Sequence, residues 1–213
     1  MLTDPDGFES SALRTPWNKG RLVGQNQKRP HKPKDVWSIR VRLEIAGSLR
    51  DLALFNLAID SKLRACDLVS LRVDDILSDG RIRERTTVVQ QKTARPVQFE
   101  LTAATRNALA AWIDQAGRRP GDYLFISRLR KSPHLSTRQY ARIVHGRVES
   151  AGLDSSAYGT HTMRRTKAAQ IYRKTGNLRA VQLLLGHTKL ESTVRYLGIE
   201  VEDALAISEQ VEL

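Results

Sequence analysis

Residues 160–199 constrain the fold more than any other stretch, because they combine three helical patterns with a concentrated set of polar side chains. Apolar side chains recur there at helical spacing in three short runs, at 163–174, 178–185 and 191–197. Gly176 ends the first run within a Thr-Gly-Asn turn, and Gly186 closes the second. The stretch therefore predicts three short helices joined by tight turns.

The same stretch places side chains that suit a phosphate at a helix start and a helix end. His161 and Arg164 are three residues apart at the entry to the first helix, so both project from one face. A helix N-terminus adds free backbone N–H groups and the positive end of its dipole. His187 follows the second helix, and Tyr196 lies in the third. These four residues describe an anion site with proton-transfer groups and a potential nucleophile, and no metal-binding carboxylate cluster accompanies them.

The spacing of these residues resembles that of a known family. His-x-x-Arg from His161, Leu-Gly-His ending at His187, and Tyr196 nine residues later resemble the C-terminal half of the tyrosine recombinase (phage integrase) catalytic domain. Each piece alone occurs by chance, whereas the three at fixed separations form a specific match. The resemblance covers roughly residues 35–206. It implies a mainly α fold with a small antiparallel β hairpin or sheet (α+β), and catalytic roles for His161, Arg164, His187 and Tyr196.

A second motif of the same family lies upstream. Residues 63–71 read LRACDLVSL, which resembles the family's first arginine motif, in which an acid follows the arginine by three residues. Without this resemblance, such a pair on a helix is an ordinary surface contact worth about 0.2–0.5 kcal/mol. The resemblance instead implies that Arg64 binds a phosphate and that Asp67 orients it.

Residues 82–101 predict a β hairpin. The run 82–91 is rich in Thr and Val, 96–101 alternates apolar and polar side chains, and residues 92–95 join the two. A lysine at a hairpin tip is ordinarily only solvated. The family, however, places its catalytic lysine on such a hairpin, which implies that role for Lys92. Arg95 is the competing candidate, although its guanidinium stays protonated and is a poor proton donor.

Most of the remaining pattern is helical. We predict further helices at 36–45, 49–59, 63–73, 103–116 and 136–151. Ser136 and Gln139 form a capping-box pattern at the start of the last of these. A short amphipathic segment follows at Val201–Val211. It packs either on its own domain or, as in the resembled family, on a neighbouring protomer.

Residues 1–34 differ from the rest of the chain, because they are rich in proline and basic residues and lack apolar periodicity. We predict a flexible basic arm, either touching DNA or serving as a plain tail, followed by one catalytic domain over residues 35–213. The arm is too short to supply the helical core-binding domain of typical family members. The chain most resembles the short, fimbrial-switch type of recombinase, which is essentially a catalytic domain alone.

The charge of the chain points to a polyanionic partner. It has 35 Lys and Arg against 23 Asp and Glu, a formal net charge of +12, so double-stranded DNA is the first candidate. The sequence has no apolar run of membrane-spanning length and no export signal, so we expect no membrane partner. Cys66 is the one cysteine, which excludes an internal disulfide and fits a cytoplasmic, nucleoid-associated protein.

The resemblance implies a site-specific DNA recombinase or integrase that works through a 3′-phosphotyrosyl intermediate. In that mechanism the two arginines hold the phosphate, Tyr196 attacks phosphorus, His161 accepts the tyrosine proton, His187 bonds a phosphate oxygen and Lys92 protonates the departing 5′ oxygen. No metal or other cofactor is required. The expected assembly is a homotetramer on synapsed DNA, with accessory DNA-bending proteins. A type IB topoisomerase-like activity and a non-catalytic DNA-binding regulator remain as alternatives.

Overall fold

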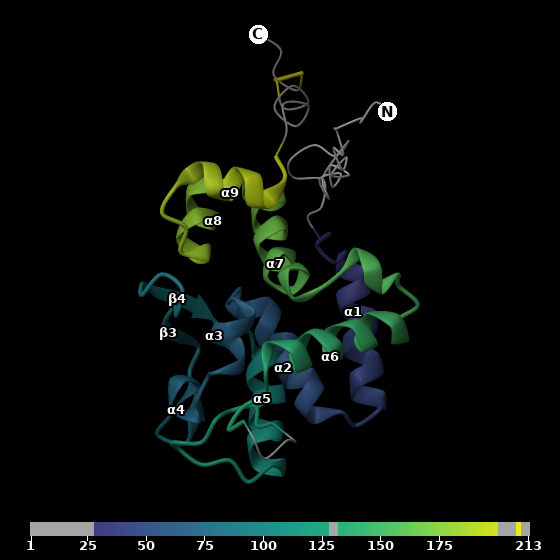
Figure 1. Ribbon diagram of the computed structural model, residues 1–213, viewed down its shortest axis with the longest axis vertical. Helices are drawn as coiled ribbons and strands as arrows, with labels where there is room; N and C mark the ends of the chain where they lie inside the picture. Colours follow the sequence, from purple (N-terminus) through teal and green to yellow (C-terminus); the bar gives the residue numbers. More distant parts are fainter. Residues whose placement is uncertain (1–27, 128–131, 200–207, 210–213) are drawn as a thin grey trace, which may run out of the picture.

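The computed structural model describes residues 28–127, 132–199 and 208–209. Helix α2 (Leu49–Ser61) lies at the centre of the molecule (Figure 1), and all its residues from 51 to 61 are buried. The elements packed around it are α1 (Pro33–Ile45), β4 (Pro96–Glu100), α5 (Ala103–Gln115) and α7 (Thr160–Thr175). A helix buried around its circumference requires such cover, so α2 sets the arrangement of its neighbours.

A partly buried ionic cluster joins α2, β4 and α7. The Nζ atom of Lys167 lies 2.8 Å from Asp60 Oδ1 and 2.6 Å from Glu100 Oε1. Lys62 Nζ donates to the Asp60 carbonyl at 2.6 Å and lies 3.2 Å from Glu100 Oε2. Buried charges are tolerated when they are paired and hydrogen-bonded in this way. The cluster therefore ties together three elements that are far apart in sequence.

The segment predicted as one helix over residues 63–73 is broken in the structure. It forms two short helices, α3 (Ala65–Val69) and α4 (Val73–Ile76). The Ser70 hydroxyl donates to two carbonyl oxygens of the preceding turn, at 2.9 and 3.2 Å, which ends α3. The carbonyl of Leu71 then accepts the N–H of Leu124 at 2.8 Å. The single-helix prediction was wrong because this pairing with a distant segment replaces the helical hydrogen bonds.

Two antiparallel hairpins make up the β structure of the described residues. The first pairs β1 (Leu77–Ser78) with β2 (Arg81–Ile82). The second pairs β3 (Arg85–Val89) with β4. In its register Thr86 lies opposite Phe99 and Val88 lies opposite Val97. The predicted hairpin is confirmed, and so is the mainly α fold with a small antiparallel β component.

Helix α6 (Thr137–Ser150) begins where the capping box predicts. The Ser136 hydroxyl accepts the N–H of Gln139 at 3.1 Å, and the Gln139 side chain accepts the N–H of Ser136 at 3.1 Å. Tyr140, Val144 and Val148 form its buried stripe in the main core. The predicted start of this helix is therefore confirmed.

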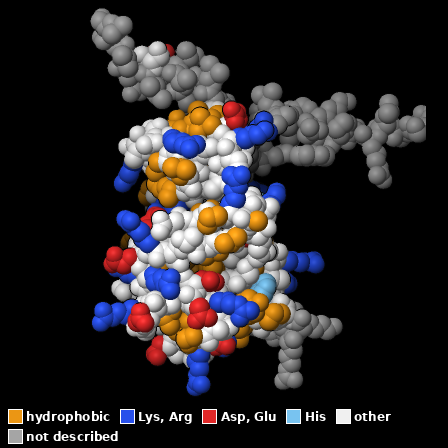
Figure 2. Space-filling view, turned by 90° about the vertical axis from the view of Figure 1, so that its left-hand side faces the viewer, with side chains coloured by type: hydrophobic (Ala, Val, Ile, Leu, Met, Phe, Trp, Pro, Cys, Tyr) orange, Lys and Arg blue, Asp and Glu red, His pale blue; other side chains and the backbone are white. Residues whose placement is uncertain are grey.

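Helices α8 (Leu178–Leu185) and α9 (Leu190–Leu197) follow α7 and confirm the three predicted runs. We call α8 and α9 the C-terminal helix pair. A small second cluster of Ala168, Val181 and Leu185 holds the pair against α7. Leu183 is 63% exposed and Leu190 is 42% exposed. Apolar side chains accordingly gather on the upper part of the face in Figure 2, so this pair is only partly covered.

The first described residues pack on the domain ahead of the predicted boundary at Asp35. His31 is buried, stacks on Tyr158 with ring centroids 4.6 Å apart, and donates its backbone N–H to Thr166 at 3.0 Å. Helix α1 then begins at Pro33, so residues 28–34 are part of the folded domain. Residues 1–27 lie outside the described residues, as does most of the predicted segment Val201–Val211.

Candidate active site

The first predicted site residues lie on the N-terminal half of α7. His161 is exposed in the first turn, whereas Arg164 is 2% exposed and points inward. One Arg164 nitrogen, Nη2, donates to the carbonyl of Leu185 at 2.6 Å. Its Nε is buried without a hydrogen-bond partner among the described residues. A buried guanidinium with an unused donor is the arrangement that an incoming anion satisfies.

Arg64 precedes α3, and its guanidinium is held by the hairpin. Its Nη1 donates to Gln90 Oε1 at 2.5 Å. Asp67 is buried in the same helix, and its Oδ1 accepts the N–H of Gln91 at 2.8 Å. Asp67 therefore fixes the backbone of the hairpin turn, and acts on Arg64 through that turn instead of through a direct bond.

Lys92 lies in the turn between β3 and β4 and is exposed. The turn is closed by the N–H of Ala94 donating to the carbonyl of Gln90 at 2.8 Å, and by the N–H of Gln90 donating to the carbonyl of Arg95 at 2.9 Å. Thr93 also donates its hydroxyl to Gln90 Oε1 at 3.0 Å. Gln90 therefore fixes the base of the loop that carries Lys92.

His187 is brought to the hairpin by Gly186. This glycine ends α8 with a φ of +65°, and a Cβ at its position would lie 2.5 Å from Val97 Cγ2. Only a residue without a side chain permits both the left-handed conformation and this approach to β4. The Nδ1 atom of His187 lies 3.1 Å from the Thr193 hydroxyl. The close packing at Gly186 thus sets where the histidine meets the body of the domain.

Tyr196 projects from α9 towards α7. Its ring lies edge-on to His187, with centroids 5.4 Å apart. The Cζ atoms of Arg165 and Arg164 lie 4.8 and 5.8 Å from its ring centroid. The tyrosine hydroxyl donates to the carbonyl of His161 at 3.4 Å, a long bond that yields easily to another partner. The nucleophile candidate therefore lies beside both histidines and an arginine of the predicted set.

The convergence of positive charge shifts the pKa values of the site. Burial, then Arg164 and Arg64, lower the pKa of His187 to about 4. Burial and nearby positive charges, among them Lys92, also lower the pKa of His161. Both imidazoles are therefore neutral at pH 7 and able to accept a proton. Burial raises the pKa of Tyr196, although the neighbouring arginines oppose this rise.

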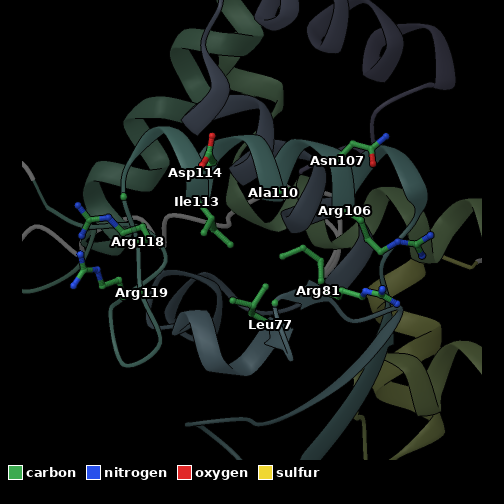
Figure 3. Close-up of a pocket in the computed structure, with 12 residues that line it drawn as sticks. Leu77, Arg81, Arg106, Asn107, Ala110, Ile113, Asp114, Arg118 and Arg119 are labelled. Atoms are coloured by element: carbon green, nitrogen blue, oxygen red, sulfur yellow. The ribbon is translucent and has the colours of Figure 1, made fainter.

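A cavity of about 600 Å³ lies elsewhere in the domain, between α5 and the β1–β2 turn (Figure 3). Arg81 and Arg106 stand at one end of it, Arg118 and Arg119 at the other, and Ile113 lies between them. None of the six predicted catalytic residues lines this cavity. The predicted catalytic residues instead lie on α7, just before α3, in the hairpin turn and on or between the helices of the C-terminal pair.

Three contacting residues were missed in the sequence. Gln90 is fully buried between Arg64 and Leu185, Thr193 is buried against His187, and Arg165 lies over the Tyr196 ring. Strand alternation could have indicated Gln90, because it shares the inward face with Thr86 and Val88. Thr193 and Arg165 carry no comparable local signal.

A comparison with models of protein families shows to which family the chain belongs. The model of the phage integrase family matches residues 33–202, which is most of the chain. The chain belongs to the phage integrase family. Within the described residues, His, Cys, Asp and Glu form no group of three or more suited to a metal ion. Nor does that part of the chain contain a helix long and apolar enough to cross a membrane.

Curated relatives of this phage integrase family member agree. A probable integrase/recombinase, YoeC, of Bacillus subtilis (strain 168) is 27% identical over 157 residues, covering 74% of this chain and 82% of that protein. A tyrosine recombinase of Pseudothermotoga lettingae is 35% identical over 150 residues, covering 70% and 50%. XerD of Rhizobium meliloti is 28% identical over 181 residues, covering 84% and 54%. The chain thus spans about half the length of the last two relatives.

Solved structures support the fold. The XerA recombinase matches with a TM-score of 0.70 at 18% identity, over 86% of this chain and 65% of that one. The XerH recombinase in its pre-cleavage complex with difH matches with a TM-score of 0.67 at 18% identity, over 88% and 56%. The described domain therefore has the fold of the site-specific recombinases' catalytic part.

Proposed function

We propose that the protein is a site-specific DNA recombinase that cleaves and rejoins DNA strands through a 3′-phosphotyrosyl intermediate. The observation that carries this proposal is the convergence of two arginines, two neutral histidines and a tyrosine at one surface. They are Arg64, Arg164, His161, His187 and Tyr196. Family membership supports the same chemistry, and the lengths of the relatives leave the activity of the whole protein as a proposal.

The two arginines bind the non-bridging oxygens of the scissile phosphate. Arg164 offers its unpartnered Nε, and Arg64 offers the donors that are not used by Gln90. We assign the Thr193 hydroxyl as the donor to His187 Nδ1, which lies 3.1 Å away, so that the Nε2 atom of that histidine carries the proton and donates to a phosphate oxygen. These groups stabilise the negative charge that grows on the pentavalent phosphorus.

Tyr196 attacks phosphorus, and the 5′ oxygen leaves. The buried phenol has a raised pKa, so it needs a neighbouring base, and neutral His161 is the candidate acceptor. The hydroxyl already lies next to the backbone of His161. Lys92 protonates the departing oxygen, and its place at the exposed tip of the hairpin turn allows it to reach a DNA strand. Rejoining reverses these steps with a 5′ hydroxyl as the nucleophile.

Double-stranded DNA is the proposed partner. The net charge of +12 supports it, and the similar structures include XerH bound to difH and a lambda integrase dimer bound to a COC′ core site. We extend the proposal to a homotetramer on two synapsed sites, with accessory DNA-bending proteins. The division into a basic arm and one catalytic domain remains a prediction, with the domain boundary moved ahead of residue 35 by the packing of residues 28–34.

The test is covalent capture. A binding site is first selected from a random-sequence duplex pool, then synthesised with a nick beside the cleavage position so that cleavage becomes irreversible. We expect a protein–DNA adduct that survives denaturation and EDTA, with the nucleotide on Tyr196 and not on any of the other four tyrosines. An adduct that requires magnesium, or none at all, would contradict the proposal. Relaxation of plasmids lacking the selected site would indicate the topoisomerase-like alternative.

A further inference from the structure

We infer that Gln90 is a positioning residue that sets the spacing between the phosphate-binding groups, an inference that rests on the function proposed above. Gln90 ends the inward face of the hairpin's first strand, and none of its surface is exposed. It stands where the hairpin, the residue before α3 and the end of α8 meet. No other described side chain bonds to all three of these segments.

The chemistry of the amide group explains why a glutamine stands here. An arginine cannot accept a hydrogen bond, so the oxygen, Oε1, must face Arg64 at 2.5 Å. The same oxygen accepts the hydroxyl of Thr93 at 3.0 Å, from the loop that carries Lys92. The amide nitrogen, Nε2, then faces the carbonyl of Leu185 at 3.4 Å. The oxygen therefore joins Arg64 to the hairpin loop, and the nitrogen reaches the end of α8 through one long hydrogen bond.

The Leu185 carbonyl extends this link to the other arginine. It also accepts Nη2 of Arg164 at 2.6 Å, so Gln90 and Arg164 share one acceptor. Gly186 and His187 follow directly in the chain, and a Cβ on Gly186 would lie 3.3 Å from Gln90 Oε1. Gln90 thus bonds directly to Arg64 and shares the Leu185 carbonyl with Arg164. That carbonyl belongs to the residue two positions before His187.

A neutral side chain suits this position better than a charged one. A glutamate would bind Arg64 as an ion pair, which would cancel the charge that the arginine presents to DNA, and would lose the donor to Leu185. A methionine of similar length would leave Arg64 without its fixed partner. Because misplacement by about 1 Å can cost on the order of 100-fold in rate, either change should affect cleavage more than binding.

The experiment compares Gln90→Met with Gln98→Met, a matched change of an exposed glutamine on the partner strand. The full-length protein is tested on the selected nicked duplex, and on the same duplex with a methylphosphonate at the cleavage position. That group lacks the negative charge that Arg64 neutralises. We expect Gln90→Met to slow cleavage of the phosphodiester roughly 10- to 100-fold, while its DNA affinity stays within about twofold of the wild type. On the methylphosphonate duplex, the cleavage rates of the variant and the wild type should differ much less.

The outcomes separate the two proposals. Arg64→Ala serves as a comparator and should show the same dependence on the phosphate charge, whereas Gln98→Met should match the wild type on both duplexes. A wild type that forms no adduct would defeat the proposed function itself. The positioning role would be overturned if the wild type cleaved normally and Gln90→Met cleaved equally fast. It would also be overturned if Gln90→Met were slowed to the same degree on both duplexes and had a lowered Tm.

Discussion

The body of the domain and the C-terminal helix pair are held together in different ways. The body surrounds α2 with one continuous apolar core that includes Leu57 and Phe125. The pair rests on three fully buried apolar side chains and leaves Leu183 largely exposed. Its other attachments include the close packing at Gly186, the hydrogen bonds to the Leu185 carbonyl and the contacts of Tyr196 with α7. The body is stabilised mainly by its large buried apolar core, whereas the pair is attached by a small apolar cluster and a few specific contacts.

This difference divides the proposed catalytic groups. Arg64, Lys92 and Arg164 belong to the body, whereas His187 and Tyr196 belong to the pair. Regions with few buried apolar contacts open locally at a lower free energy than global unfolding. We therefore expect the proposed phosphate-binding groups to stay in place when α8 and α9 open locally, whereas the proposed nucleophile moves with the pair. The comparison predicts which substitutions alter chemistry and which alter stability.

The largest expected effect is on chemistry alone. Tyr196→Phe removes the nucleophile and one long hydrogen bond, so adduct formation should fall below detection while Tm shifts little. DNA affinity should hold, because charge supplies most of it. A denaturing gel, a binding titration and a thermal melt measure the three quantities. If the variant still formed an adduct, the assignment of the nucleophile to the pair would be lost.

Lys92→Ala should lower cleavage by roughly 10²- to 10⁴-fold through loss of the general acid, again without a change in stability, because the side chain is exposed. A substrate with sulfur at the bridging 5′ position should restore the rate, since a thiolate leaves without a proton. Arg95→Ala, in the same turn, is the control. Rescue of that variant in place of Lys92→Ala would reassign the acid.

Stability should respond most strongly in the body. Leu57→Ala empties a fully buried site in α2 and should lower the free energy of unfolding by about 2–5 kcal/mol. Val181→Ala in the pair removes two buried methyl groups and should lower the free energy of unfolding by about 1–2 kcal/mol. Hydrogen exchange should accelerate throughout the domain for the first variant, but only in α8 and α9 for the second. Equal acceleration everywhere would mean that the pair unfolds together with the body.

The junction should respond to added volume. Gly186→Ala and Gly176→Ala both place a side chain in the left-handed region, but only the former meets another atom, Val97 Cγ2. We expect Gly186→Ala to cost about 1–3 kcal/mol more than its control and to slow cleavage by displacing His187. Denaturant titrations of both variants give the difference. Indistinguishable variants would show that the close approach contributes nothing to the attachment of the pair.

The smallest effect concerns pH. Burial lowers the pKa of His31 to about 4, although Asp35 opposes this. In the unfolded chain the histidine has an ordinary pKa near 6.5 and binds the proton more readily. The stabilisation that comes from keeping His31 neutral is therefore complete above pH 6.5 and is lost as pH falls towards 4. Between pH 7 and 5.5 the body should lose about 1 kcal/mol. His31→Phe keeps the stacking on Tyr158 and should remove this part of the pH dependence.

Features encoded by local signals were predictable. The capping box at Ser136, the turn at Gly176 and the alternation in the hairpin each involve residues within a few positions of one another. Their structural consequences follow from backbone chemistry alone. For this reason the start of α6, the end of α7 and the strand pairing agree with the structure.

Features that depend on distant contacts were not predictable. The break after α3 comes from pairing with Leu124, and the docking of His31 requires Tyr158 and Thr166. Family spacing brought the six catalytic candidates to attention. It could not indicate that Gln90 links them, because that link exists only after the hairpin packs against α8.

Arg165 links the first described residue to the proposed nucleophile. Its Nη1 donates to the carbonyl of Lys28 at 2.6 Å, while its guanidinium lies over the Tyr196 ring. The backbone of Lys28 is therefore only one side chain away from Tyr196. A change that shifts this backbone would alter, through Arg165, the packing against the ring of the proposed nucleophile, although Lys28 and Tyr196 are far apart in the sequence.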